Sequence, residues 1–577
     1  MTLRNRDIAT LFKRLADLLE IEGENPFRIQ AYRNAAETIE GLAAPVTELV
    51  AAETDLTQYS HIGKDIAEKI EGVVATGRLA ALDEVAQRVP PELADLMGVK
   101  GLGPKGVKAL HDHFHIRSVD ELEQLAREGR VRELSGFGAK KEAALLEGIH
   151  ELHARQYQRT PLAEAEAQAE PLRAWLAAVD GVECIEIAGS YRRRRETVGD
   201  IDIVVACADG AAVMERLVRY DGIERVASRG TTRSSVILAD GLQVDVRAVP
   251  TESFGAALMY FTGSKQHNVA LRQRAIQRDL KLNEYGLFQG DDAVAGADEP
   301  GIYRQLGLVW IPPELRGDRG EVEAAERDHL PALIEADAIR GDLHAHTTWS
   351  DGRDTLEDMA RGARARGYEY LAITDHGPRV RIANGLSPER LQTQAEAIAE
   401  LDASLDGITL LKGCEVDILA DGTLDLPDEV LATLDIVVCS IHYNLRQSRQ
   451  EQTDRVLRAM ENPYFMIWGH PTAREVNRRE PIDIDLERCL EEAAEHGIAI
   501  EVSAQPKRLD LNDAGARLAR EKGCRLVINT DAHSVGNLDL VRHGVDQARR
   551  AWAEAEDIIN TRGLVELRKA LRTPPGG

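Results

Sequence analysis

Apolar positions recur in three rhythms along the chain, and each rhythm predicts a different kind of structure. Over roughly the first 150 residues they return every three or four positions, as in amphipathic helices, with short glycine turns between them. Farther on, VECIEIA, DIDIVVA and LQVDVRAV alternate as strands do. From residue 337 onward, apolar β-runs alternate with helical stretches, which predicts a β/α barrel with its polar site at the carboxyl ends of the strands.

Two segments between these regions follow neither pattern. PLAEAEAQAE, residues 161–170, is acidic and low in complexity, so we interpret it as a linker or a solvated helix. RGDRGEVEAAERDHLPALIEAD, which begins at residue 316, is highly charged and is predicted to join two large units.

Composition limits the possible classes of protein. With 577 residues, 43% hydrophobic and 29% charged, the chain is expected to be soluble and to form three or more domains, and no apolar run approaches the ~20 residues of a membrane span. Its six cysteines form no CxxC pair, which is typical of buried thiols in a reducing cytoplasm. The net charge of −26 excludes a global basic field, so any contact with DNA must come from local patches and backbone amides.

The helical region repeats one kind of turn, in HIGKDIAEKIEGVV, VKGLGPKGVKALHDHF and LSGFGAKKEAALLEGI. In each, an apolar residue and glycines precede an amphipathic helix, whose free N–H groups can hold an anion. Three copies, each with a lysine, favour helix-hairpin-helix elements that bind the DNA backbone over ordinary helix connections. The candidate contacts are Gly63, Gly101, Gly103, Lys105, Gly136, Gly138 and Lys140.

Three aspartates are candidates for a magnesium site in the strand region. Asp200 and Asp202 stand two residues apart in GDIDIVV, so both project from one face of a strand, and QVDVRAV offers Asp245 on another strand. Such a set of carboxylates suits Mg²⁺, which shares its remaining positions with phosphates. Gly189 and Ser190 supply a tight turn with N–H groups and a hydroxyl for a triphosphate, and Arg193 supplies charge.

Histidines and carboxylates follow almost every β-run of the C-terminal region. A single pair such as His344-Ala-His346 is more often two polar residues at a strand end than half a metal site. Here, however, nine N and O ligands recur at successive strand ends: His344, His346, Asp351, His376, Glu415, His442, His470, Asp531 and His533. Imidazole with carboxylate suits Zn²⁺, Mn²⁺ or Fe²⁺, and nine ligands suffice for about three ions.

The middle region resembles a known family. GSYRRRRETVGDIDIVV, together with YFTGSKQHN, is similar to the nucleotidyltransferase palm of the family X DNA polymerases. The resemblance implies that the three aspartates bind two metal ions and that Asp245 accepts the proton of the primer 3′-hydroxyl. It also implies nucleotide contacts by Gly189, Ser190, Arg193, Gly199, Tyr260, Phe261, Gly263 and Asn268. Gln243 stands where the mammalian polymerase of this family has an arginine.

The N-terminus resembles the small lyase domain of the same family, which grips the 5′-phosphate of a gap, through NPFRIQAYRNAAETI and IGKDIAEKIEGVVATGRL. By this resemblance Lys69 is the Schiff-base lysine, and Tyr32 is a helper that contacts DNA. An amine nucleophile needs a pKa lowered by burial or a cationic neighbour. The sequence does not show such a neighbour, so Lys69 is either catalytic or a plain DNA contact. We expect 5′-phosphate binding more firmly than lyase chemistry.

The C-terminal region resembles the PHP (polymerase and histidinol phosphatase) domain, a distorted (β/α)7 barrel with a trinuclear metal cluster. Every ligand position of that family is present, which implies a working metal-dependent hydrolase. Arg381 and Arg474, on loops after barrel strands, are candidate phosphate contacts, with surface salt bridges as the alternative.

Together these features predict a multidomain α/β protein: helical helix-hairpin-helix domains, a nucleotidyltransferase palm with a mixed β-sheet, and a C-terminal barrel. The expected domains are a lyase-like 5′-phosphate-binding domain (1–85), helix-hairpin-helix fingers (86–158), the palm (159–252), a thumb (253–315), a linker (316–335) and the PHP domain (336–577).

The predicted function is a DNA repair polymerase that fills short gaps, fused to a metal-dependent 3′–5′ exonuclease that could extend to abasic sites or 3′-phosphates. Its substrates would be dNTPs and gapped or primed DNA with a 5′-phosphate. Two Mg²⁺ or Mn²⁺ ions are expected in the palm, and about three Mn²⁺, Zn²⁺ or Fe²⁺ ions in the barrel. We expect a cytoplasmic monomer without a membrane partner. The alternatives are a histidinol-phosphate-type phosphatase with a vestigial polymerase, and a non-catalytic scaffold for DNA ends.

Overall fold

The computed structural model describes residues 5–42, 45–155 and 159–572, and the chain divides into two compact units, Met1–Arg159 and Thr160–Gly577. The predicted domain boundary at residue 158 lies outside the described residues. None of the helices in the described ranges combines the length and the hydropathy that crossing a membrane requires.

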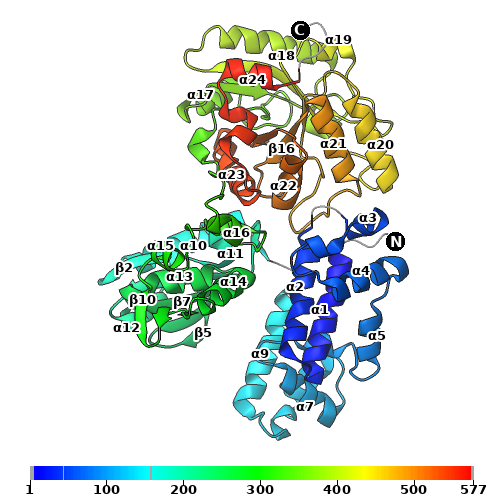
Figure 1. The fold of residues 1–577 in the computed structure, drawn as a ribbon. Helices are drawn as coiled ribbons and strands as arrows, with labels where there is room; N and C mark the ends of the chain where they lie inside the picture. The colour runs from blue at the N-terminus through cyan, green and yellow to red at the C-terminus, as the bar shows by residue number, and fades with distance from the viewer. Residues whose placement is uncertain (1–4, 43–44, 156–158, 573–577) are drawn as a thin grey trace. The chain divides into compact units, whose positions relative to one another are not determined.

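The first unit is helical (Figure 1). Its core joins residues from successive helices, among them Phe12, Tyr32, Ile70, Leu110 and Leu145. The helices are α1 (Asn5–Glu22), α2 (Pro26–Glu40), α3 (Val46–Ala51), α4 (Lys64–Thr76), α5 (Ala80–Ala86), α6 (Leu93–Leu96), α7 (Pro104–Phe114), α8 (Val119–Arg127) and α9 (Ala139–Arg155).

Each of the three repeated glycine turns leads into a helix, as predicted. Gly63 is the residue before α4, and Gly103 is the residue before α7. Gly101 and Gly136 have φ of +84° and +88°, in the left-handed region that glycine adopts without steric cost. The turns are exposed, so the first N–H groups of the helices that follow are available to an anion.

The second unit begins with a mixed sheet of five strands, in the order β2-β4-β7-β6-β5. The central strands β4 and β7 are parallel, and the other neighbours are antiparallel. The strands are β2 (Val182–Ile187), β4 (Asp200–Cys207), β5 (Ile223–Arg229), β6 (Arg233–Leu238) and β7 (Gln243–Val249).

Helices cover both faces of this sheet. On one face, α10 (Leu162–Ala177) and α12 (Gly210–Leu217) share a core with β4 and β7, while α13 (Phe254–Thr262) packs on the other face through Ala257 and Leu258. The interpretation of residues 161–170 as a linker or a solvated helix was therefore wrong. The segment opens α10, and its Leu162, Ala165 and Ala169 are buried against the sheet, because alanine and leucine recur at helical spacing among the glutamates.

A smaller layer of helices and a three-stranded sheet follow α13. Its elements are α14 (Lys265–Ile276), β8 (Lys281–Asn283), β9 (Gly286–Gln289), β10 (Asp292–Ala295), α15 (Glu299–Gln305) and α16 (Glu321–Glu326). The charged segment predicted to be a linker is folded here. Ala325 of α16 belongs to the core of this layer, and Glu321 is buried with its carboxylate bound to His267 and to the N–H groups of Asp318 and Arg319.

The C-terminal region is the predicted barrel, with seven parallel strands in sequence order (Figure 1). A parallel bridge between Ala345 and Ala532 joins its first and last segments. The strands are β11 (Gly341–Asp342), β12 (Tyr370–Ile373), β13 (Thr409–Asp417), β14 (Ile436–Ser440), β15 (Ile467–Trp468), β16 (Ala499–Ser503) and β17 (Leu526–Asn529). Its helices are α17 (Leu356–Ala365), α18 (Pro388–Asp402), α19 (Asp428–Leu431), α20 (Arg449–Met460), α21 (Leu486–His496), α22 (Asp513–Glu521), α23 (Val541–Arg550) and α24 (Leu564–Ala570).

A buried ion network ties the five-stranded sheet to the layer that follows it. The carboxylate of Glu299 accepts paired hydrogen bonds of 2.7–2.9 Å from the guanidinium groups of both Arg192 and Arg316, and a bond of 2.9 Å from the indole of Trp310. Arg316 is fully buried, so its charge depends on this one carboxylate for compensation.

Replacing Glu299 with alanine should therefore destabilise the protein strongly, by about 3–5 kcal/mol, because the buried guanidinium of Arg316 and the half-buried one of Arg192 lose their partner. Urea unfolding of the second unit measures the change. Glu326→Ala, which breaks the exposed pair between Arg274 and Glu326, is the matched control and should change little. Equal effects of the two substitutions would contradict the proposed importance of the buried network.

Candidate active sites

The three predicted palm carboxylates meet on neighbouring strands. Asp202 of β4 lies directly opposite Asp245 of β7, and Asp200 is two residues earlier on the same face of β4. Ile201 and Val244, which neighbour these aspartates on the two strands, point into the core. Because side chains alternate along a strand, the carboxylates project from the opposite face of the sheet.

The three carboxylates repel one another electrostatically. Burial, followed by the charges of Asp200 and Asp245, raises the pKa of Asp202 to about 7. Asp245 is held by hydrogen bonds from the hydroxyl of Ser235 and from the amide of Gln243, the latter 3.1 Å long. A hard divalent cation would relieve the repulsion, so the residues fit the implied magnesium site.

Gly189 must be glycine for this site to form. It has φ of +64°, and a Cβ there would lie 2.8 Å from the Oδ2 atom of Asp202. The chain therefore passes close beside the carboxylate and leads directly to Ser190.

The predicted nucleotide-binding residues lie next to one another. The guanidinium of Arg193 donates to the carbonyl of Thr262, and a Cβ on Gly263 would lie 3.1 Å from its Nη1. The side chain of Asn268 donates to the carbonyl of Tyr260 across 2.6 Å. Phe261 follows Tyr260 in α13, and Gly199 directly precedes Asp200.

All nine predicted barrel ligands converge at the carboxyl ends of the strands. Three groups of them have ligand atoms within 4.8 Å of one another: His346, Asp351, His376 and His533; His344, His346 and Asp531; and His376, Glu415 and His442. His470 joins them through Glu415, with its Nε2 atom 2.8 Å from Oε1. Shared members connect the groups, so the cluster is continuous.

Several ring nitrogens of this cluster are buried without a hydrogen bond among the described residues, including Nε2 of His344, both nitrogens of His346 and Nδ1 of His470. Buried polar atoms are normally satisfied, so these converging nitrogens indicate missing partners. Together with the nearby carboxylates, they are the donors that Zn²⁺, Mn²⁺ or Fe²⁺ prefer. The residues therefore fit a bound cluster of such ions.

The charges within the cluster shift the pKa values of its members in opposite directions. Burial alone would lower the pKa of His442, but the carboxylates of Glu415 and Asp417 raise it to about 10. The pKa of Glu415 is held well below its usual range, because His442, His376 and His344 outweigh the effect of burial. Burial and the charges of His533 and His376 lower the pKa of His346 to about 4.

Two carboxylates behind the ligands escaped the sequence analysis. Oε1 of Glu501 lies 2.7 Å from Nδ1 of His344 and accepts from Asn529, while Oδ1 of Asp417 lies 3.1 Å from Nδ1 of His442. Such partners fix the orientation of a ligating imidazole. Their signal was their position in barrel strands otherwise apolar, IAIEVSA and GCEVDI.

Of the two predicted phosphate-binding arginines, Arg474 is turned toward the palm. It is buried, and it forms an ion pair with Glu196 of the loop that follows Arg193. The salt-bridge alternative is therefore the one found for Arg474. Arg381 is exposed, in the loop after β12 that carries His376.

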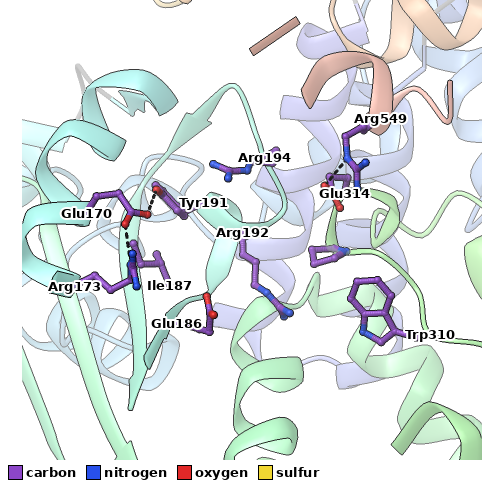
Figure 2. A pocket seen from close by; sticks show the side chains of 11 residues that line it. Glu170, Arg173, Glu186, Ile187, Tyr191, Arg192, Arg194, Trp310, Glu314 and Arg549 are labelled. Atoms are coloured by element: carbon purple, nitrogen blue, oxygen red, sulfur yellow. Dashed lines mark hydrogen bonds and ion pairs between the residues drawn. The ribbon is translucent and has the colours of Figure 1, made fainter. Parts of the chain in front are cut away.

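The loop of the palm that contains Arg193 makes ion pairs in several directions. Arg194 lies near Glu166 of α10 and Asp546 of α23, and Arg550 donates to the carbonyl of Arg193 across 2.7 Å. A cavity of about 380 Å³ lies beside this loop. Figure 2 shows side chains that line it, among them Arg192, Arg194, Trp310 and Glu314, with Arg549 hydrogen-bonded to Glu314. The lining arginines have carboxylate partners, so this cavity is a junction between folded parts rather than an anion site.

In the first unit, Lys69 lies on α4 and forms an ion pair with Asp65. The ion-pair partner of Lys69 is thus a carboxylate, whereas a Schiff-base lysine is expected to have a cationic neighbour. Tyr32 belongs to the core, with 2% of its surface exposed, a position that does not favour its predicted contact with DNA. Lys105 and Lys140 are exposed at the hairpin turns.

Family models match most of the chain. They are the Helix-hairpin-helix domain (residues 3–79), the SAM-like Helix-hairpin-helix tandem (93–151), the DNA polymerase beta palm (159–269), the DNA polymerase beta thumb (257–317) and the PHP domain (342–570).

Similar proteins fall into two groups. The chain is 37% identical over 574 residues to the protein named DNA polymerase/3′-5′ exonuclease PolX of Bacillus subtilis, covering 99% of this chain and 100% of that protein. It is 33% identical over 212 residues to a probable phosphatase of Acetivibrio thermocellus, covering 35% of this chain and 83% of that protein. A probable phosphatase of Syntrophotalea carbinolica is 28% identical over 235 residues, covering 38% of this chain and 90% of that protein.

The raised pKa of Asp202 predicts a pH-dependent cost of folding without metal. A raised carboxyl pKa stabilises the fold at low pH, and that stabilisation is lost as the pH rises through about 7. In EDTA, Asp202→Asn should therefore be more stable than the wild type above pH 7, by about 1–2 kcal/mol after allowance for solvent screening, and no more stable at pH 4. Thermal unfolding at the two pH values measures this, and a gain that was the same at both would contradict the assignment.

Proposed function

The chain belongs to the family X DNA polymerases that carry a C-terminal PHP domain, and we propose that it fills short gaps in DNA and removes nucleotides from 3′ ends. One observation carries the proposal: the carboxylate set of the palm and the ligand set of the barrel are both complete in one chain. Synthesis belongs to the first set and hydrolysis to the second.

In synthesis, Asp245 accepts the proton of the primer 3′-hydroxyl while Ser235 and Gln243 hold its carboxylate in place. Two Mg²⁺ or Mn²⁺ ions bound with Asp200 and Asp202 would activate that hydroxyl and neutralise the leaving pyrophosphate.

The incoming nucleotide is bound by the loop and helix beside these carboxylates. The N–H groups after Gly189, with Ser190, Gly199 and Arg193, bind the triphosphate. Tyr260, Phe261 and Gly263 pack against the sugar, and Asn268 contacts the nucleotide from the minor-groove side. Two hydrogen bonds support this arrangement. That from Arg193 to Thr262 joins the loop to α13, and that from Asn268 to Tyr260 joins α14 to α13.

In hydrolysis, the barrel residues orient about three ions of Mn²⁺, Zn²⁺ or Fe²⁺, which would activate water and hold the phosphate. Glu501 and Asp417 fix the imidazoles of His344 and His442. The PHP model matches this region, and the likeness to probable phosphatases, which covers 35% and 38% of the chain, supports a phosphoesterase. The complete palm carboxylates speak against a phosphatase with a vestigial polymerase, and the complete ligand set speaks against a non-catalytic scaffold.

The first unit binds the DNA backbone and the 5′-phosphate of a gap through its exposed hairpin turns. Lys69 serves this binding rather than Schiff-base chemistry, because its partner is the carboxylate of Asp65. The domain limits 1–85, 86–158, 159–252, 253–315, 316–335 and 336–577 complete the proposal, with 316–335 as a folded connection. We further propose that the protein acts as a monomer in the cytoplasm.

Separate metal sites predict separable activities. Asp200→Ala should lower nucleotide addition on a one-nucleotide gap by on the order of 1,000-fold and leave Mn²⁺-dependent degradation of single-stranded DNA intact. His344→Ala should do the reverse, and its metal content should fall below the about three barrel ions expected of the wild type. Both activities are measured on one preparation of each protein. Loss of both activities in either variant, with the fold intact, would contradict the division.

A second prediction concerns DNA ends. A gap with a 5′-phosphate should bind more tightly than the same gap with a 5′-hydroxyl, with a shallow salt dependence, because an acidic protein offers few phosphate contacts. Lys69→Ala should reduce the difference in affinity between the two gaps, whereas Lys140→Ala should weaken the binding of both gaps equally. Fluorescence anisotropy measures the six affinities, of three proteins for two gaps. Equal binding of the two gaps by the wild type would contradict a 5′-phosphate pocket.

A further inference from the structure

One guanidinium faces the barrel cluster without a hydrogen bond at its Nε atom. Arg508 lies in the turn after β16, and its Nε is 3.9 Å from Oδ2 of the candidate ligand Asp531. This Nε is buried and has no hydrogen-bond partner among the described residues. A buried, unsatisfied donor beside a phosphoesterase centre indicates a missing acceptor.

The turn that carries Arg508 is fixed to the cluster. Gln505 donates from its side chain to the carbonyl of Asp531 across 2.8 Å, and the N–H of Arg508 donates to the carbonyl of Gln505, also across 2.8 Å. Both carboxylate oxygens of Asp510 are bound by Thr472, two residues after the candidate ligand His470. The backbone thus holds Arg508 at the edge of the cluster at two points.

We propose that Arg508 is the cation that binds the scissile phosphate in the barrel, and that Glu196 of the palm positions it through Arg474. This inference rests on the proposed hydrolysis in the barrel. Arg508 takes the role for which the sequence offered Arg381 and Arg474 as candidates, and Arg474 is paired with Glu196 instead.

The chemistry of the site calls for such a cation. Water attacks the phosphorus, the bond to the 3′-oxygen of the shortened strand breaks, and that oxygen takes a proton, so that a nucleoside 5′-monophosphate leaves. Negative charge accumulates on the phosphate oxygens in the transition state, and a planar guanidinium matches their geometry better than an ammonium does. When the carboxylate of Asp531 is engaged by metal, Arg508 is free to donate to the phosphate.

The positioning contact is a hydrogen bond from Nε of Arg474 to the carbonyl of Arg508, 2.9 Å long. Arg474 is itself buried, and its other end pairs with Glu196. The carbonyl of Lys507 accepts from the N–H of Val476 on the same loop. A side chain three residues beyond Arg193 of the nucleotide-binding loop is therefore connected to the exonuclease site.

The first experiment compares Arg508→Gln and Arg508→Lys with the wild type. Arg508→Gln should lower kcat/KM for degradation of single-stranded DNA about 100-fold, and Arg508→Lys should recover part of it. Inorganic phosphate should bind the Mn²⁺-loaded Gln variant about 10-fold more weakly by calorimetry. Metal content should stay at the wild-type value.

Two outcomes would overturn the role of Arg508. Unchanged phosphate affinity would show that Arg508 does not bind the phosphate, and a parallel loss of metal would show that it only supports Asp531. Because phosphate binding is measured without turnover, this result is independent of whether the wild type degrades DNA. If the wild type binds phosphate but does not degrade DNA, the proposed exonuclease fails instead.

The second experiment tests the connection. Glu196→Gln should lower both exonuclease kcat/KM and phosphate affinity several-fold. As in Arg508→Gln, the loss in kcat/KM should exceed the loss in phosphate affinity. The matched control is Arg542→Gln, which breaks another ion pair from the barrel to the palm, 2.7 Å long, with Glu166. If Glu196→Gln and Arg542→Gln changed phosphate affinity equally, Glu196 would not position Arg508.

Discussion

Charge compensation around one loop organises the second unit. Residues 192–196 follow the glycine turn at Gly189, and all of them except the exposed Arg195 are half-buried charged residues. Arg192 is compensated by Glu299, Arg194 by Glu166 and Asp546, and Glu196 by Arg474. Because a buried charge is costly without a partner, the parts that supply these partners must dock before the loop can hold its shape.

This dependence joins the nucleotide site to both of its neighbours. The same loop, which carries the proposed triphosphate contacts Ser190 and Arg193, contacts the layer after α13 through Glu299, and the barrel through Arg474 and Arg550. The two catalytic centres have separate metal ligands, but they share a structural element. A fusion of two enzymes by a flexible tether would need no such shared ion pairs, and the folded segment 316–335 is consistent with a fixed connection.

The sequence predicted those features that depend on local periodicity. Asp200 and Asp202 had to share a face because strands have a period of two, and ligands recurring at strand ends had to converge in a parallel barrel. The features that it missed depend on contacts between distant residues. The distance of 278 positions between Glu196 and Arg474 hides their pairing. In PLAEAEAQAE, by contrast, leucine and alanine recur at helical spacing, but the high charge led to the interpretation as a linker or solvated helix. Glu501 was overlooked because one carboxylate in an apolar strand has no recognisable spacing. Asp417 was overlooked although it stands two residues after Glu415 in the same strand.

The two candidate metal sites also differ in how the charges of their carboxylates are compensated. In the palm, three carboxylates with few cationic partners raise the pKa of Asp202, so the site gains most from a hard divalent ion that exchanges with each nucleotide. In the barrel, histidines balance Glu415 and Asp531, whose pKa values are held well below their usual range even without metal. In the barrel, ligands of opposite charge therefore compensate one another, whereas the palm carboxylates repel one another and would gain compensation from a bound cation.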